Sequence, residues 1–191
     1  MNIKVTLTED MLGTVPKNKE IYKDYILTKI PSSNIDINEN EINTVPDMEE
    51  KGWTGFHTDE LGLFVWDYFI KGFLKHAGNV LKDSLGVKAL KSKLDDFVFV
   101  LPRKIYLGKA VPDGVLERPI RVMTPQGPRV SLIRSDFVRA GTGFKFDIVM
   151  YPTHKEITLE LINTLLGYGK FMGFGQFRNG GYGRFAYELV L

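Results

Sequence analysis

The sequence predicts an α+β protein on the ferredoxin-like, RRM-like βαββαβ plan, with two insertions. Three observations predict it: an alternating strand at the N-terminus, two amphipathic helices separated by a hairpin of β-prone residues, and an alternating C-terminal strand. In chain order these elements form a split βαβ motif. We expect one domain over residues 1–191, with insertions at about 17–59 and 94–128.

The first element is a half-buried strand. Ile3, Val5 and Leu7 alternate with polar residues, and a period of two is typical of a strand with one buried face. The following stretch, 17–59, is polar, acidic and rich in Asn, Ser and Pro, with a short helix expected just after Pro16. Because it is poor in core residues, we interpret it as an insertion.

The first long helix is predicted over residues 63–85, where apolar residues recur at helical spacing. Gly86 is a suitable C-terminal stop. Gly72 and Gly78 lie inside the helix, where each glycine costs about 1 kcal/mol relative to alanine. We therefore expect close backbone packing or a close ligand at these positions.

The second insertion is predicted from proline and glycine. The run Phe97–Leu101 has β propensity, but Pro102 restricts it to the edge or end of a sheet. Residues 108–128 are rich in Gly and Pro and are expected to form a loop. We therefore leave both stretches outside the βαββαβ plan.

The second half of the plan begins with a hairpin predicted from residues 129–137 and 142–151, with a glycine-containing turn between the two strands. A second amphipathic helix follows, with Thr153 and Glu156 at capping-box spacing. The final strand is the alternating stretch 185–189. These elements complete the predicted fold.

Composition excludes several classes of protein. The chain contains no cysteine, which excludes disulfides, zinc–thiolate sites and thiol catalysis. No apolar run reaches the roughly 18 residues that a membrane-spanning helix needs, and the N-terminus lacks the plan of a signal peptide. We expect a cytoplasmic protein with no membrane contact, no cofactor and no metal.

Charge is unevenly distributed, although the net charge is only +2. Residues 36–60 carry eight acidic residues against one lysine, and residues 103–145 carry nine basic residues against three acidic ones. A basic segment of this kind favours an anionic ligand. The alternative is that both segments are solvated surface or pair with each other.

The most unusual segment is the glycine-rich stretch 167–184. Glycine lets the backbone approach a partner closely, and exposed amides can cradle an anion. Lys170, Arg178 and Arg184 add positive charge, and aromatic rings offer stacking surfaces for bases. The glycines are Gly167, Gly169, Gly173, Gly175, Gly180, Gly181 and Gly183, and the rings include Phe171, Phe174, Phe177 and Tyr182. Neither a Walker loop nor a dinucleotide fingerprint fits this spacing. The alternative is a tight connection whose rings fill the core.

Three motifs in this order resemble the RAMP superfamily, the repeat-associated proteins of CRISPR systems. They are most similar to its backbone subunits, which polymerise along a guide RNA. The motifs are residues 69–75 (FIKGFLK), 138–146 (VRAGTGFKF) and 173–185 (GFGQFRNGGYGRF). Phe69 stands where the family has a serine, so one small hydroxyl contact would be lost.

The resemblance implies RNA binding along a basic sheet face and the glycine-rich segment. By position, the lysines of the first motif would contact phosphates, and the last glycines would line the path of the RNA backbone. The candidate RNA- or nucleotide-binding residues are Lys71, Gly72, Lys75, Arg134, Gly173, Gly175, Arg178, Gly180, Gly181, Gly183 and Arg184.

A second hypothesis follows from a further resemblance, to uncharacterised proteins of phages and prophages. It implies an anti-defence protein, placed in the host cytoplasm, that binds a CRISPR complex or sequesters a signalling cyclic nucleotide. The expected partners are thus RNA or a phosphate-bearing nucleotide, a CRISPR or other defence complex, and further copies of the chain.

A third hypothesis is a metal-independent RNA endonuclease, because related RAMP processing enzymes use histidine as general acid or base. The catalytic candidates are His57, expected in a polar loop, and His76, on the first helix. Backbone subunits instead use an aspartate from an insertion, for which Asp36 or Asp47 is available. No known catalytic motif is present, so a non-catalytic protein is favoured over an enzyme.

Overall fold

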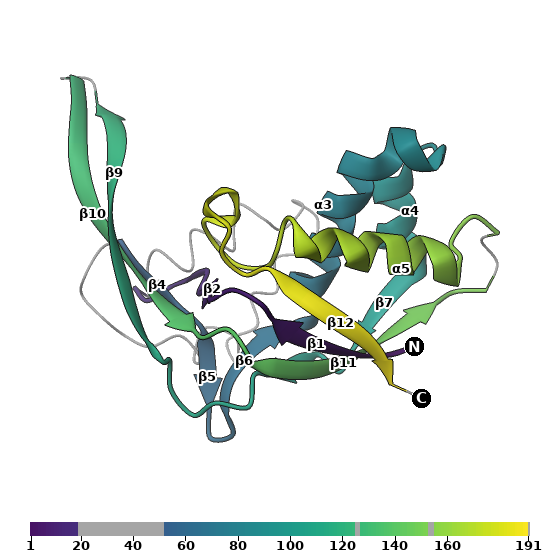
Figure 1. Cartoon of the computed structure of the whole chain (residues 1–191), viewed down its shortest axis with the longest axis horizontal. Coiled ribbons are helices and arrows are strands. Elements are labelled where there is room, and N and C mark those ends of the chain that lie inside the picture. Colours follow the sequence, from purple (N-terminus) through teal and green to yellow (C-terminus); the bar gives the residue numbers. More distant parts are fainter. Residues whose placement is uncertain (19–51, 125–126, 153–154, 191) are drawn as a thin grey trace.

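The computed structural model describes residues 1–18, 52–124, 127–152 and 155–190. Its centre is a four-stranded antiparallel sheet in the order β12–β1–β11–β7. The strands are β1 (Asn2–Leu7), β7 (Val98–Leu101), β11 (Gly143–Met150) and β12 (Phe185–Val190). The helices are α3 (Asp67–Leu85), α4 (Leu90–Phe97) and α5 (Leu159–Gly167). Figure 1 shows them on one side of this sheet, which confirms the predicted α+β class.

The apolar periodicity of the sequence becomes the core between this sheet and the helices. Alternate residues of β1 and β11 are buried, as are residues at helical spacing in α3 and α5. The helix residues are Ile70, Phe73, Leu74, Ala77, Leu161, Ile162, Leu165 and Leu166. Thr158, rather than Thr153, caps α5: its side chain accepts a hydrogen bond from the Leu161 N–H at 3.1 Å. Thr153 lies outside the described residues.

The start of the first helix was predicted too early. Gly62–Trp66 forms strand β6, and the helix begins only at Asp67. All five residues of β6 are buried, so the stretch has neither the period of a half-buried strand nor that of an amphipathic helix. β6 lies between β5 (His57–Asp59) and β8 (Lys104–Tyr106) in a separate three-stranded sheet.

The second strand of the four-stranded sheet was also predicted wrongly. It is Val98–Leu101, which pairs with β11 and lies inside the insertion expected at 94–128. The turn before β11 does not close a hairpin, because its backbone bonds to the end of β1. The Gly141 N–H donates to the Leu7 carbonyl oxygen at 2.7 Å, and the Leu7 N–H donates to the Thr142 carbonyl oxygen at 2.9 Å.

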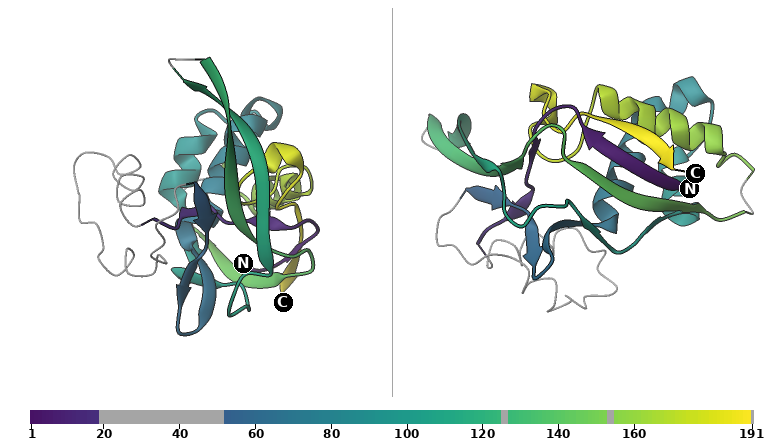
Figure 2. Two further views of the ribbon diagram at one scale, coloured as in Figure 1. Left: turned by 90° about the vertical axis from the view of Figure 1, so that its left-hand side faces the viewer. Right: turned by 60° about the horizontal axis from the view of Figure 1, so that its bottom comes forward.

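The predicted strand 129–137 belongs to a different hairpin. β10 (Gly127–Val138) pairs from Gly127 to Phe137 with β9 (Gly114–Thr124), all of which was expected to be loop. Figures 1 and 2 show the β9–β10 hairpin projecting from the rest of the protein. The base of β10 also pairs with β2 (Met11–Leu12) and β4 (Trp53–Gly55), and β3 (Val15–Pro16) pairs with β4. The arginines of the basic segment lie largely on this hairpin rather than on the four-stranded sheet.

The insertion expected at 17–59, with its short helix, lies mostly outside the described residues. Its described end contributes β4 and β5. None of the described helices combines the length and the apolar character needed to cross a bilayer.

Candidate functional site

The glycine-rich segment connects α5 to β12 and folds back on itself. It contains two short 3-10 turns, η1 (Tyr168–Lys170) and η2 (Arg178–Gly180). The Phe174 N–H donates to the Gly183 carbonyl oxygen at 2.9 Å, and a Cβ on Gly173 would overlap the same carbonyl. The Gly183 N–H donates to the Asp10 carbonyl oxygen at 2.7 Å. Gly173 and Gly183 therefore allow backbone to pack on backbone within the protein.

The rings of this segment divide into buried and exposed ones. Phe174 is 2% exposed and stacks on Phe185, with ring centroids 4.2 Å apart and an angle of 4° between the planes. Phe171 and Phe177 are 71% and 47% exposed. Phe174 therefore fills the core, as the alternative of a tight connection predicted, whereas Phe171 and Phe177 face solvent.

Arg118, Phe177 and Tyr182 form a column of stacked groups between β9 and the glycine-rich segment. The Arg118 guanidinium carbon lies 4.4 Å from the Phe177 ring centroid, and the Phe177 and Tyr182 rings stack at 5.6 Å and 27°. Arg118 also donates to the Gln176 side-chain oxygen at 3.3 Å. Burial lowers the pKa of Arg118, and Tyr182 partly offsets this effect. The column joins a cation of the projecting hairpin to two rings of the glycine-rich segment.

A buried carboxylate fixes the base of the hairpin next to this column. Asp136 is 2% exposed, and its two oxygens accept from Trp53 Nε1 and Lys17 Nζ, each at 2.7 Å. The Lys17 ammonium lies 4.2 Å from the Trp53 ring centroid, and the Arg134 guanidinium lies 5.6 Å from it. Arg134 also pairs with Glu117 at 2.6 Å. Because a buried charge needs such partners, the network holds β4 against β10.

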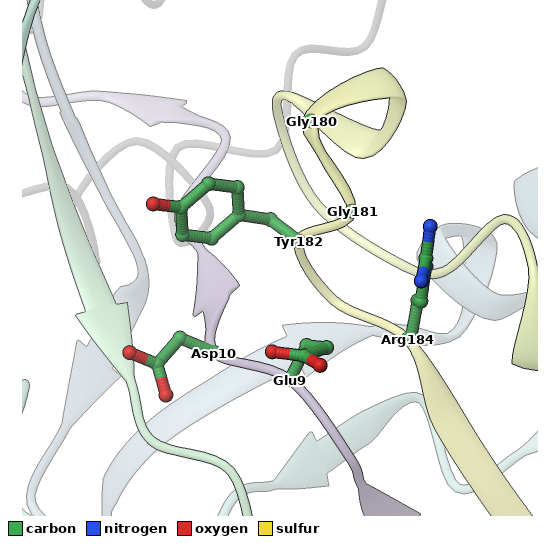
Figure 3. A pocket seen from close by; sticks show the side chains of 6 residues that line it. All are labelled: Glu9, Asp10, Gly180, Gly181, Tyr182 and Arg184. Carbon is green, nitrogen blue, oxygen red and sulfur yellow. The ribbon is translucent and has the colours of Figure 1, made fainter.

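A pocket of about 360 Å³ opens between the end of β1 and the glycine-rich segment. Figure 3 shows the side chains around it. Its lining residues are Glu9, Asp10, Gly180, Gly181, Tyr182 and Arg184. Asp10 Oδ1 accepts from the Ala140 N–H at 2.8 Å, and the Arg184 Nε is buried without a hydrogen-bond partner in the described structure. Tyr182 belongs to both the pocket and the column.

The structure brings only some of the predicted binding residues together. Gly180, Gly181 and Arg184 meet at the pocket. Gly175, like Gly173 and Gly183, packs against protein backbone, in its case at Leu12.

Lys71 and Lys75 point elsewhere, toward Asp95 of α4. Lys75 Nζ lies 2.6 Å from Asp95 Oδ2, and Lys71 Nζ donates to the Asp95 carbonyl oxygen at 2.6 Å. These contacts lower the pKa of Asp95, with the hydrogen bond from Lys75 as the largest cause. Gly72 is exposed on the same helix, with open space around it. The face of α3 that meets the glycine-rich segment carries Phe73, which packs edge-on against Phe174.

His76 lies on α3, the first long helix, as predicted, whereas His57 does not lie where it was expected. His57 lies in β5, is 3% exposed and stacks on Phe64, so its expected place in an exposed polar loop is wrong. Burial, and secondarily the charge of Lys104, lower the pKa of His57 to about 4. Burial and the charge of Arg178 also lower the pKa of His76. The aspartates proposed for catalysis, Asp36 and Asp47, lie outside the described residues.

The two acidic residues of the pocket, Glu9 and Asp10, were not predicted from the sequence, although the predicted topology contained a signal for them. In the order β12–β1, the end of the first strand lies beside the start of the last one, as the Leu7–Phe185 pair shows. The residues after Leu7 must therefore approach Arg184. Arg118 had no distinguishing signal among the nine basic residues of its segment.

Comparisons with known proteins bear on the fold. The chain matches no known protein-family model, and no curated protein matches it in sequence. The fold is similar to a chain in the cryo-EM structure of the Type III-B Cmr-beta bound to cognate target RNA, with a TM-score of 0.51 and 12% identity. That match covers 100% of this chain and 58% of the other, so this chain spans less than two thirds of its length.

A second similar structure is a chain of a Type IV-B CRISPR complex, with a TM-score of 0.50 and 10% identity over 99% of this chain and 89% of that one. At these identities the likeness concerns the fold alone. The chain thus shares an α+β fold with chains of CRISPR complexes.

Proposed function

We propose that this chain is a non-catalytic RNA-binding protein, and that RNA lies where the β9–β10 hairpin meets the glycine-rich segment. The strand order β12–β1–β11–β7, with α3 and α5 in the two crossover connections, supports a ferredoxin-like βαββαβ core. The similarity of the fold to a chain from an RNA-bound complex supports RNA as the ligand.

The observation that carries the proposal is the column of Arg118, Phe177 and Tyr182. Bases of single-stranded RNA stack on aromatic rings and on guanidinium planes, and this contact tolerates any sequence. Phe177 is 47% exposed, so one side of the column is open to a ligand. Its cation and its rings come from separate parts of the chain, which places a stacking surface beside a positive charge.

The hairpin adds charge for phosphates. Residues 114–138 contain four arginines and two acidic residues, and one of these acids, Asp136, is already neutralised by Lys17. Arg121 is exposed on β9. Because arginine is in excess on the β9–β10 hairpin, the hairpin attracts the phosphate backbone of RNA, and this attraction weakens as salt concentration rises.

His57 is poorly suited to acid–base catalysis of an exposed RNA. His57 is enclosed and holds a pKa of about 4, so it is neutral at pH 7. A catalytic group must reach its substrate and have a pKa near the operating pH. These properties support binding rather than cleavage.

A salt series of RNA-binding measurements tests the proposal. We expect labelled single-stranded RNA to bind at low salt, with affinity falling linearly on logarithmic axes. Arg118→Ala should make that slope shallower by about 0.7, the value for one phosphate contact on a single strand. The matched control is Arg103→Ala, which removes an equally charged, 61% exposed side chain on the β7–β8 connection. Absence of binding at low salt to RNA of any length would refute the proposal.

A further inference from the structure

We propose that the pocket between the end of β1 and the glycine-rich segment binds a guanine base. This inference rests on the proposed function, since it specifies the base that RNA would present at this surface. The pocket volume of about 360 Å³ falls in the range of about 300–1,000 Å³ typical of small-ligand sites. Figure 3 shows acidic, basic and aromatic side chains on its different sides.

Opposite charges line the pocket without pairing. Within the described part of the chain, no ion pair joins the Glu9 carboxylate to the Arg184 guanidinium. The guanidinium lies against Gly181, where a Cβ would be 3.5 Å from Arg184 Cζ and where the φ of +90° favours glycine. Because Arg184 makes no ion pair with the acids of this pocket among the described residues, its guanidinium donors remain available to a ligand acceptor.

The acidic side of the pocket is held rigidly. Asp10 accepts the Ala140 N–H through Oδ1 at 2.8 Å and the Gly183 N–H through its carbonyl oxygen at 2.7 Å. Its neighbour Glu9 is exposed, which leaves that carboxylate available to a ligand donor. The backbone that carries both carboxylates is thus bonded to the turn before β11 and to the glycine-rich segment.

The mixed lining excludes simpler ligands. A metal cation would be repelled by Arg184, and a phosphate would be repelled by Glu9 and Asp10. The pocket instead suits a group that is uncharged and flat and that carries both donors and acceptors. A nucleobase has these properties, and beside Tyr182 it would extend the column in which that ring already stacks on Phe177.

Guanine fits the arrangement better than the other bases. Its N1–H and N2–H donors lie side by side on one edge, matching the two oxygens of a carboxylate such as Glu9. Its O6 and N7 acceptors lie on the adjacent edge, matching the guanidinium fork of Arg184. Adenine, cytosine and uracil do not have N–H donors at two adjacent positions of one edge.

The test compares mononucleotides that share the same phosphate. Calorimetric titration with GMP, IMP and AMP should show GMP binding about 5- to 150-fold more tightly than AMP, the discrimination typical of a bidentate base contact. IMP, which lacks the 2-amino group, should lie between them. Two RNA oligomers, one containing guanosine and one made only of adenosine, show whether the same preference holds in RNA.

Glu9→Gln should reduce the GMP-to-AMP preference, because an amide offers one acceptor oxygen to the two donors of guanine, and only the Arg184 contact would still favour GMP. The control Glu188→Gln changes an exposed acid paired with Lys4 at 3.4 Å and should keep the preference; thermal unfolding checks that both variants fold. A GMP preference without RNA binding would support the guanine pocket but refute the proposed RNA-binding function. RNA binding with equal GMP and AMP affinity, or a GMP-to-AMP preference that Glu9→Gln leaves unchanged, would refute the guanine pocket alone. Failure of both ligands to bind would refute both.

Discussion

The rings of Phe174 and Phe185 stack nearly parallel, 4.2 Å apart, so the middle of the glycine-rich segment is anchored in the hydrophobic core. Phe73 packs against both rings. The segment is therefore not a loose loop on the surface. Its exposed parts are presented from a fixed support.

This anchoring predicts a large loss of stability on truncation of the buried ring. Phe174→Ala should lower the free energy of unfolding by about 3–5 kcal/mol, because it removes a large buried ring and leaves a cavity. Urea unfolding followed by tryptophan fluorescence measures this change. The control is Phe171→Ala in the same segment, whose ring is 71% exposed and whose loss should change stability by less than about 0.5 kcal/mol. Equal effects of the two variants would contradict the anchoring.

The stacking column predicts a separate effect on binding. Phe177→Ala should weaken RNA binding by up to about 5- to 150-fold, because loss of the middle ring disrupts the column on which a base stacks, and one base–ring stack contributes about 1–3 kcal/mol. The affinity should fall for every RNA sequence alike, and fluorescence polarisation with two unrelated oligomers can check this. Phe177→Tyr keeps the ring and should retain the affinity. A Phe177→Ala variant with unchanged affinity would show that RNA does not use the column.

Two glycines with different surroundings predict opposite changes in stability. Gly173→Ala should destabilise the protein, because the new Cβ would overlap the backbone at Gly183. Gly72→Ala should stabilise it by about 0.5–1 kcal/mol, since Gly72 is exposed within α3 with open space around it. Thermal unfolding of the two variants gives the sign of each change. Stabilisation by Gly173→Ala would contradict the backbone contact.

The buried imidazole predicts a pH dependence of stability. The pKa of His57 is about 4 in the folded state and about 6.5 in the unfolded chain, so between these values the unfolded state binds more protons. The contribution of His57 is therefore complete above pH 6.5 and falls by about 3 kcal/mol as the pH drops to 4.

His57→Phe keeps a ring beside Phe64 and cannot be protonated, which makes it the matched variant for this measurement. Its stability should fall less than that of the unchanged protein between pH 6.5 and pH 4. Denaturant titrations at several pH values give the two curves. Parallel curves would show that His57 does not titrate in this range.

Sequence periodicity predicted the elements that have one buried face. β1 was identified because Ile3, Val5 and Leu7 alternate with polar residues, and all three are buried in the structure. β6 was missed because a strand buried on both faces has no such pattern. The run at 97–101 was predicted to have β propensity, and 142–151 was predicted as a strand, but their pairing was not predicted, because strand pairing depends on where the chain returns in space.

The candidate site was predicted in outline only. The glycine-rich segment was identified from its composition. Composition alone cannot distinguish Phe174, which is buried, from Phe177, which is exposed. Only the folded backbone decides which ring faces the core. The contacts of Arg118 with Phe177 and of Asp136 with Trp53 join residues from different elements, and no local pattern encodes them.

The position of Pro119 in β9 has a consequence for self-association. β9 pairs with β10 on one side only, among the described strands, so its other side is a free sheet edge. Such an edge can template the addition of a strand from another molecule, and proline and charged side chains oppose this. Pro119 has no N–H to donate, and arginines lie on either side of it at 118 and 121. The hairpin can therefore extend into solvent without nucleating fibrils along β9.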